Sequence, residues 1–170
     1  MLFLLMAVGA LALPVNAWSG EHAAVYKSLG DDLLRRGNAE AAIEHYQKAA
    51  ALDPASTALY FNLAVAHYTG RDIPRATAAL EKLVSLDPGD AEAQYNLACL
   101  YLYQRNTDAA RRHFERAKTC CELKKDSFLG GLAVKNLEFI NELGRLDPSA
   151  QGLFFLLLRN GLPPLSTQDR

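Results

Sequence analysis

Two asparagines, Asn62 and Asn96, have the spacing that most directly suggests chemistry. Their numbers differ by 34, since 96 − 62 = 34. A side-chain amide both donates and accepts hydrogen bonds, so two amides in one row could bind the backbone of an extended peptide without reading its side chains. The alternative is a structural role for both amides. Either role requires elements of structure that repeat at the interval of the two asparagines.

The histidines of the chain are not grouped for catalysis or metal binding. His45 and His113 are interpreted as surface residues of helices, and His67 as a partly buried, hydrogen-bonded residue. We find no nucleophile beside a base, no phosphate-binding loop and no paired carboxylates. The sequence therefore predicts neither an enzyme nor a cofactor or metal site.

Three cysteines are present, and none belongs to a Cys-x-x-Cys motif. Cys120 is predicted to be a small core residue. A disulfide from Cys99 to Cys120 or to Cys121 remains open, because sequence does not give the geometry that a bridge needs.

The chain contains an internal repeat. The triplet Leu52-Asp53-Pro54, whose proline is expected to end a helix, returns as Leu86-Asp87-Pro88, and 88 − 54 = 34. Three windows of this period align without a gap, and we assign them as repeats: 23–56, 57–90 and 91–124. Within each window the apolar residues are spaced by threes and fours, which predicts two amphipathic helices.

Residues at fixed positions of the window predict how the two helices pack. Small residues that allow close approach recur at the eighth and twentieth positions: Gly30, Ala64, Ala98, Ala42, Ala76 and Ala110. Large residues beside them are expected to fill the contact: Leu29, Leu63, Leu97, Tyr46, Leu80, Phe114, Leu52 and Leu86. The break between helices is predicted at Gly37, Gly70 and Arg105, followed by the N-cap residues Asn38, Asp72 and Asn106.

This pattern resembles the tetratricopeptide repeat over residues 23–124. The first window matches the family at Gly30, Ala42, Tyr46, Ala49 and Pro54. The resemblance implies an all-α fold, a solenoid of helix-turn-helix repeats whose first helices line a concave face. Glu122 stands where the third window would have its proline, so we expect the third repeat to end differently from the others.

In the family that this chain resembles, protein segments bind in the concave groove. The resemblance implies that the groove includes the following residues: Lys27, Asp31, Phe61, Asn62, Val65, Tyr68, Glu92, Tyr95, Asn96, Cys99 and Tyr103. The groove positions of the second and third windows are mostly aromatic or uncharged, and tyrosines there could form apolar pockets with a polar tip.

One subtype of the family clamps the C-terminal carboxylate of heat-shock chaperones with Lys and Asn side chains and one Arg. Lys27 and Asn62 match that clamp, whereas Asp31, Glu92 and Asn96 do not. A carboxylate would meet like charge at Asp31 and Glu92, so we do not expect this chain to bind chaperone tails.

Residues 1–17 are predicted to be a secretory signal peptide. Residues 2–13 are uninterrupted apolar residues, Pro14 follows, and Val15-Asn16-Ala17 suits cleavage before Trp18. No basic residue precedes Lys27, and the alternatives are an uncleaved membrane anchor or a buried N-terminal helix. The signal peptide and the anchor both predict an exported protein, periplasmic or attached to the cell envelope, with membrane contact only through this segment if it is uncleaved.

Beyond the repeats, residues 125–147 are predicted to be a capping helix, and 148–170 a short apolar helix followed by a tail. Leu146-Asp147-Pro148 repeats the helix-ending triplet out of phase. The run from Leu153 to Leu158 is too short to span a membrane. We expect it to fold onto the array, with self-association or contact with a partner as the alternative.

The 170-residue chain has a formal charge of −1, which does not suggest a nucleic-acid partner. The sequence favours a non-enzymatic adaptor of the cell envelope that binds a protein or peptide partner in the groove. The alternative is a structural subunit of an envelope complex, packed through its C-terminal apolar helix.

Overall fold

A computed structural model describes residues 15–159, which form helices and no strand. The predicted signal or anchor segment, apart from its last three residues, and the predicted tail lie outside the described residues. The helices are α1 (Val15–Arg35), α2 (Ala39–Leu52), α3 (Thr57–Thr69), α4 (Ile73–Leu86), α5 (Ala91–Tyr103), α6 (Thr107–Lys124), α7 (Ser127–Leu143) and α8 (Pro148–Arg159). The predicted all-α solenoid is confirmed.

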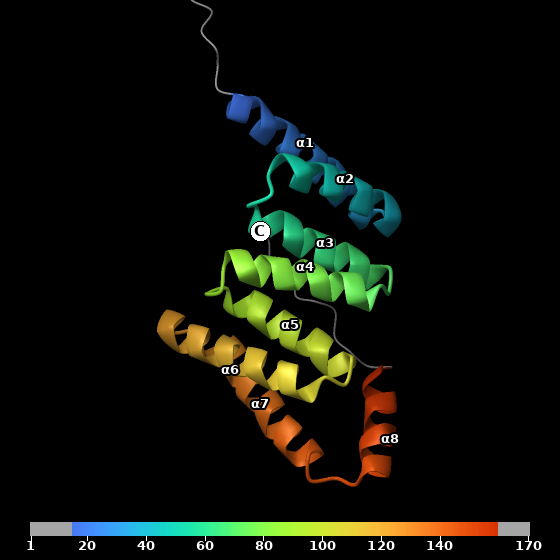
Figure 1. Ribbon diagram of the computed structural model, residues 1–170, viewed down its shortest axis with the longest axis vertical. Helices are drawn as coiled ribbons and strands as arrows, with labels where there is room; N and C mark the ends of the chain where they lie inside the picture. Colours follow the sequence, from blue (N-terminus) through green and yellow to red (C-terminus); the bar gives the residue numbers. More distant parts are fainter. Residues whose placement is uncertain (1–14, 160–170) are drawn as a thin grey trace, which may run out of the picture.

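The first six helices form three antiparallel pairs that stack in chain order, and α7 packs on α6 (Figure 1). α8 turns back to contact α5. α3 and α5 have the same length, 13 residues, and begin at the first position of their windows. None of the described helices is both long and apolar enough to cross a bilayer.

The turn within each pair reverses the chain through one residue with positive φ. This residue is Gly37 (φ 79°), Arg71 (φ 61°) or Arg105 (φ 62°). The predicted break at Gly70 is wrong by one residue, because Gly70 has an ordinary φ of −75° and Arg71 takes the left-handed conformation. The repeat therefore fixes the turn geometry at its fifteenth position, with or without a glycine there.

The residue after each turn caps the second helix of the pair, as predicted. The side-chain oxygens of Asn38, Asp72 and Asn106 accept hydrogen bonds from backbone N–H groups of the following helix at 3.2, 3.1 and 3.1 Å. These contacts satisfy donors that have no partner within the first helical turn.

Close approach within a pair depends on the predicted small residues. Ala42, Ala76 and Ala110 are fully buried. Gly30 lies under the ring of Tyr46, and a Cβ atom added to Gly30 would come within 2.6 Å of Tyr46 Cε1. In the first pair, the ring of Tyr46 thus packs closely because position 30 is a glycine.

Two of the large residues expected to fill the core are exposed in the first repeat. Leu63 is 7% exposed, whereas Leu29, in the same position of the first window, is 45% exposed. α3 packs on α2, but no described element packs on the corresponding face of α1. Leu52 is 36% exposed.

The third repeat ends differently from the others, as expected. α6 continues to Lys124, Lys125 adopts a left-handed φ of 58°, and Asp126 caps α7 by accepting from the N–H groups of Phe128 and Leu129. Cys121 is the buried thiol, while Cys120, predicted to be a core residue, is half-buried.

The third Leu-Asp-Pro triplet has a role opposite to the predicted one. Instead of ending a helix, its Asp147 accepts hydrogen bonds from Ser149 and Ala150 N–H at 2.9 and 3.0 Å. Pro148 is the first residue of α8. An Asp before a Pro suits an N-cap as well as a helix end, so the triplet starts α8 here.

Candidate functional site

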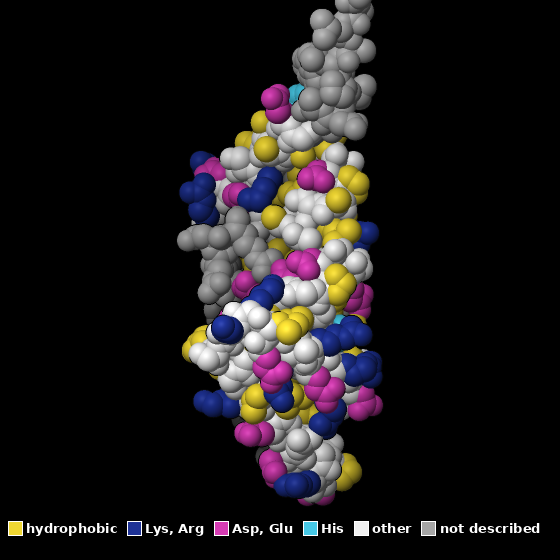
Figure 2. Space-filling view, turned by 90° about the vertical axis from the view of Figure 1, so that its left-hand side faces the viewer, with side chains coloured by type: hydrophobic (Ala, Val, Ile, Leu, Met, Phe, Trp, Pro, Cys, Tyr) yellow, Lys and Arg dark blue, Asp and Glu magenta, His cyan; other side chains and the backbone are white. Residues whose placement is uncertain are grey.

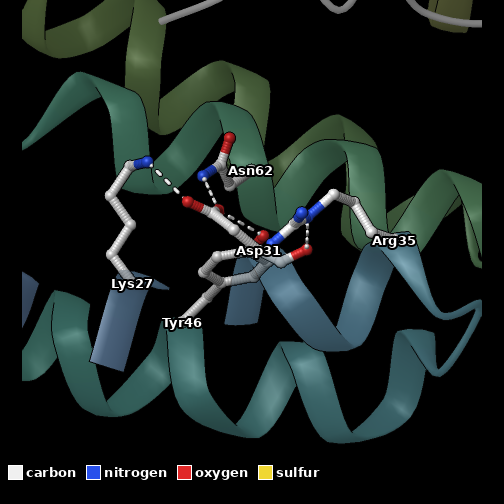
Figure 3. Close-up of polar contacts among 5 residues, drawn as sticks. All are labelled: Lys27, Asp31, Arg35, Tyr46 and Asn62. Atoms are coloured by element: carbon white, nitrogen blue, oxygen red, sulfur yellow. Dashed lines mark hydrogen bonds and ion pairs between the residues drawn. The ribbon is translucent and has the colours of Figure 1, made fainter. Parts of the chain in front are cut away.

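The predicted groove residues come from the first helices α1, α3 and α5, and the structure gathers them into two unlike clusters. Lys27, Asp31 and Asn62 form a polar cluster between α1 and α3 (Figure 3). Tyr68, Cys99 and Tyr103 lie near one another between α3 and α5. The other predicted groove residues divide by exposure: Phe61 is buried, and Val65, Glu92 and Tyr95 are half-buried.

Asp31 is the centre of the polar cluster. Its Oδ1 accepts hydrogen bonds from Tyr46 Oη at 2.8 Å and Asn62 Nδ2 at 2.9 Å. Its Oδ2 pairs with Lys27 Nζ at 2.9 Å, and the Arg35 side chain reaches its backbone oxygen at 3.4 Å (Figure 3). One carboxylate thus joins α1, α2 and α3.

The environment of Asp31 affects the chemistry of its neighbours. Burial, reinforced by the hydrogen bond to Asp31, raises the pKa of Tyr46 well above its usual range, so this phenol stays protonated. The Lys27 charge faces the Asp31 carboxylate, and the Asn62 amide nitrogen donates to it. Asn62 is therefore a link between repeats, the structural role left open from the sequence.

Asn96, in the same position of the next repeat, has a different environment. The residue in phase with Asp31 is Val65, because 31 + 34 = 65. Valine offers no acceptor, and Asn96 Nδ2 is a buried atom with no hydrogen-bond partner in the described part of the chain, although the residue is only 3% exposed. A buried donor without an acceptor is costly, which marks this position as one that a ligand could satisfy.

The surroundings of Cys99 are aromatic and uncharged. Burial raises the pKa of the Cys99 thiol to about 12 and that of Tyr95 to about 12. Tyr95 Oη accepts a hydrogen bond from Asn136 Nδ2 on α7 at 3.0 Å, and its ring meets Phe114 edge-on at 5.3 Å. Cys99 is thus a neutral thiol at physiological pH, suited to apolar contact rather than to nucleophilic attack.

Sequence reasoning missed a buried polar contact near the N-terminal end of α5. Gln94 is fully buried, and its Nε2 donates to the backbone oxygen of Pro88 at 3.0 Å. One repeat earlier, Tyr60 Oη donates to the oxygen of Pro54 at 3.3 Å. The signal was the shared position of Tyr60 and Gln94, since both side chains can donate to the carbonyl that follows the second helix.

His113 completes this contact and is not the surface residue that was predicted. Its Nδ1 lies 2.7 Å from Gln94 Oε1, and its ring stacks on Tyr101 with centroids 5.4 Å apart. Burial, followed by the charges of Arg116 and Arg112, lowers the pKa of His113. His45 is likewise half-buried, because its ring packs against Tyr26 at 5.9 Å.

The remaining candidates for chemistry are dispersed. His67 is buried as predicted, and burial lowers its pKa. Cys99, Cys120 and Cys121 are free thiols, so the open question of a disulfide is answered against one in this structure. Among residues 15–159, no group of three His, Cys, Asp or Glu could hold a metal ion.

Two family models match the repeat region. A TPR repeat model matches residues 30–70, and a tetratricopeptide repeat model matches residues 79–112. Residues 30–70 and 79–112 thus match the tetratricopeptide repeat family. The matched segments include Asp31 and Asn62 of the polar cluster and the α5 residues around Asn96, whereas Lys27 lies outside them.

Two curated relatives come from Arabidopsis thaliana. The inactive TPR repeat-containing thioredoxin TTL3 is 33% identical over 97 residues, which are 57% of this chain and 14% of that protein. The TPR repeat-containing thioredoxin TTL4 is 33% identical over 87 residues, 51% of this chain and 13% of that protein. The chain thus spans a small part of these relatives.

Solved structures share the fold at low sequence identity. The first TPR of Spaghetti (RPAP3) bound to an HSP90 peptide has a TM-score of 0.63 and 22% identity, covering 75% of this chain and 96% of that chain. The Yersinia enterocolitica type III secretion translocator chaperone SycD has a TM-score of 0.67 and 16% identity, covering 74% and 88%. The arrangement of the helices in this chain is thus that of known tetratricopeptide domains.

Proposed function

We propose that this protein is a non-enzymatic adaptor that binds an extended protein segment across α3 and α5. The observation that carries the proposal is the unpaired Nδ2 of Asn96, a buried donor on α5, the helix that also carries the half-buried Tyr95 and Tyr103. A backbone carbonyl of the ligand would give this donor the acceptor that Val65 does not offer. The rings of Tyr68 and Tyr103 would contact the neighbouring apolar side chain of the ligand. A solved structure of the same fold is bound to a peptide, which supports a ligand of this kind.

The charge of the first repeat argues for a ligand unlike an acidic chaperone tail. In this chain Lys27 is paired with Asp31, and Asn62 donates to the same carboxylate. A ligand carboxylate would have to displace Asp31 from both groups, against like-charge repulsion. We therefore propose a segment with apolar side chains and no requirement for a free C-terminus.

We further propose that the adaptor works outside the cytoplasm, in the cell envelope. The support is the apolar run of residues 2–13, followed by Pro14 and the small residues typical of signal-peptidase sites. N-terminal sequencing of the mature chain tests this proposal. A chain that begins at Trp18 is expected, and one that still carries residues 1–17 in the cytoplasmic fraction contradicts it.

The groove proposal is tested by crosslinking the full chain to its partners in envelope extracts and comparing three forms of the protein. Asn96→Leu removes the unpaired donor while keeping the number and branching of the side-chain heavy atoms, and we expect it to lose most of the partner captured by the wild type. Gln47→Leu likewise replaces an amide by leucine, at an exposed position on α2, and should leave capture unchanged. Unchanged capture by Asn96→Leu, with folding intact by circular dichroism, contradicts the assignment of Asn96.

A further inference from the structure

The apolar residues at the two ends of the helical array differ in how far they are covered. At the C-terminal end α7 covers the third pair and buries Ala133, Ile140 and Leu143. At the other end, α1 presents Val25, 57% exposed, and Leu29, 45% exposed. In the next repeat the equivalent residues, Leu59 and Leu63, are buried against the preceding pair. Figure 2 shows hydrophobic side chains exposed near the α1 end of the array.

The exposed residues of α1 belong to one stripe. His22, Val25, Leu29 and Asp32 are spaced by three, four and three positions, the spacing of the contact face of a two-helix coiled coil. The two central positions are apolar and the two outer ones are polar. α1 is one continuous helix from Val15 to Arg35, and the stripe also lies within it when the chain begins at Trp18.

The order of residues in this stripe is self-complementary in one orientation. If two α1 helices pack antiparallel about a two-fold axis near position 27, the residue numbers that face each other sum to 54. Val25 then faces the second copy's Leu29, and His22 faces the second copy's Asp32. In a parallel pair, Asp32 of one copy would instead face Asp32 of the other copy, which brings two negative charges together.

We propose that this protein forms a two-fold symmetric dimer through the α1 stripe, with a second copy of the same chain as the partner. Asp32 already pairs with Arg35 and Arg36 at 3.3 and 2.7 Å, and its side chain is still partly exposed. A carboxylate accepts about four hydrogen bonds, so it can also accept one from the imidazole N–H of the second copy. The proposal does not depend on the groove, because Asp31 contacts α2 and α3 on another side of α1.

The contact is small, since each copy contributes one helix and two central apolar side chains. Small interfaces are typical of transient complexes. We therefore expect a dimer that dissociates in the micromolar range, detectable as a weight-average mass that rises with protein concentration.

Sedimentation equilibrium of the full chain tests the proposal. Leu29→Lys places a charge in the centre of the stripe, and we expect the dimer dissociation constant to rise about tenfold or more. Leu29 is exposed in the monomer, so circular dichroism should show unchanged helix content. Leu123→Lys makes the same change at a leucine that is 81% exposed near the opposite end of the array, and should leave association unchanged.

The orientation is tested by mixing two charge-reversed variants. Asp32→Lys alone and His22→Glu alone should each weaken association, because each puts like or poorly matched charges opposite one another. In a mixed dimer the lysine introduced at position 32 of one chain faces the glutamate introduced at position 22 of the other, so an equimolar mixture should associate at least as well as the wild type. A chain that is monomeric up to about 100 µM, a dimer that Leu29→Lys leaves intact, or a mixture no better than the single variants overturns the proposal.

Discussion

The junction between the first and second repeats and the junction between the second and third contain the same asparagine with opposite consequences. Asn62 donates to Asp31 at 2.9 Å, whereas the residue in phase with Asp31 in the next repeat is Val65, and Asn96 Nδ2 has no partner among the described residues. The first junction is thereby fastened by a polar network. The second keeps a buried donor that has no partner among the described residues, and the proposed binding site rests on this donor.

The two junctions also differ near the N-terminal ends of α3 and α5. Tyr60 contacts the Pro54 carbonyl near the surface, whereas Gln94 makes the equivalent contact to Pro88 from a fully buried position and also meets His113. The second junction is thus held, near the N-terminal end of α5, by the neutral amide of Gln94 and the imidazole of His113. Its stability is therefore sensitive to the protonation of a histidine.

The largest expected effect is at the first junction. Asp31→Ala would leave the buried Tyr46 hydroxyl and the Asn62 amide without their acceptor, and we expect the free energy of unfolding to fall by about 2–3 kcal/mol. Urea denaturation followed by circular dichroism measures it. Asp31→Asn retains an acceptor oxygen and should lose less. Equal losses in the two variants would show that the oxygen itself does not hold the junction.

The two asparagines provide the direct test of the comparison. Asn62→Leu removes a hydrogen bond to a carboxylate and should destabilise the chain by about 1–2 kcal/mol. Asn96→Leu removes a donor that has no acceptor among the described residues, so stability should stay the same or rise by up to about 1 kcal/mol. Thermal and urea unfolding of the two variants side by side measure the difference, and similar losses would break the contrast between the junctions.

The first and second repeats have different residues at the positive-φ position of the turn, Gly37 and Arg71, and each can be replaced. Arg71 has φ 61° where the first repeat has Gly37, and a non-glycine residue in this region costs about 1 kcal/mol. Arg71→Gly should therefore raise the free energy of unfolding by about 1 kcal/mol, and Gly37→Ala should lower it by a similar amount. Changes of the same sign in both variants would be inconsistent with this account.

The smallest expected effect is the pH dependence at the second junction. The folded state lowers the pKa of His113 below its ordinary 6.5, so the unfolded chain binds the proton more tightly. The stabilisation is complete above pH 6.5 and is lost as the pH falls through 6.5 towards the folded pKa. His113→Gln should reduce the loss of stability between pH 7 and pH 5. A wild-type slope retained in His113→Gln would place the sensitivity elsewhere.

The fold was predictable because its signals are local and repeated. The N-caps Asn38, Asp72 and Asn106 and the buried alanines each recur at the period of the repeat and could be recognised without knowing which helices touch. The Asp31 network could not be predicted in this way. It depends on a contact between α1 and α3, and nothing in the repeat distinguishes Asn62 from Asn96 until Asp31 and Val65 are placed beside them.

Exposure at the ends of the array was also hidden from the sequence. Leu29 and Leu63 have the same position and the same residue type, so a periodic pattern assigns both to the core. The two leucines differ only in what packs on them. A preceding helix pair covers Leu63, whereas among the described helices no pair precedes the first repeat to cover Leu29.

The stacking of each helix mainly on its neighbours in the chain has a consequence for how fast the protein folds. The packed pairs are separated by short turns, so forming them requires little loop closure, and low contact order is associated with rapid folding. Structure can begin at any pair and spread to the next, as in a one-dimensional lattice. The Asp31 network, which joins α1 and α2 to α3, is then the step at which the first pair becomes coupled to the growing array.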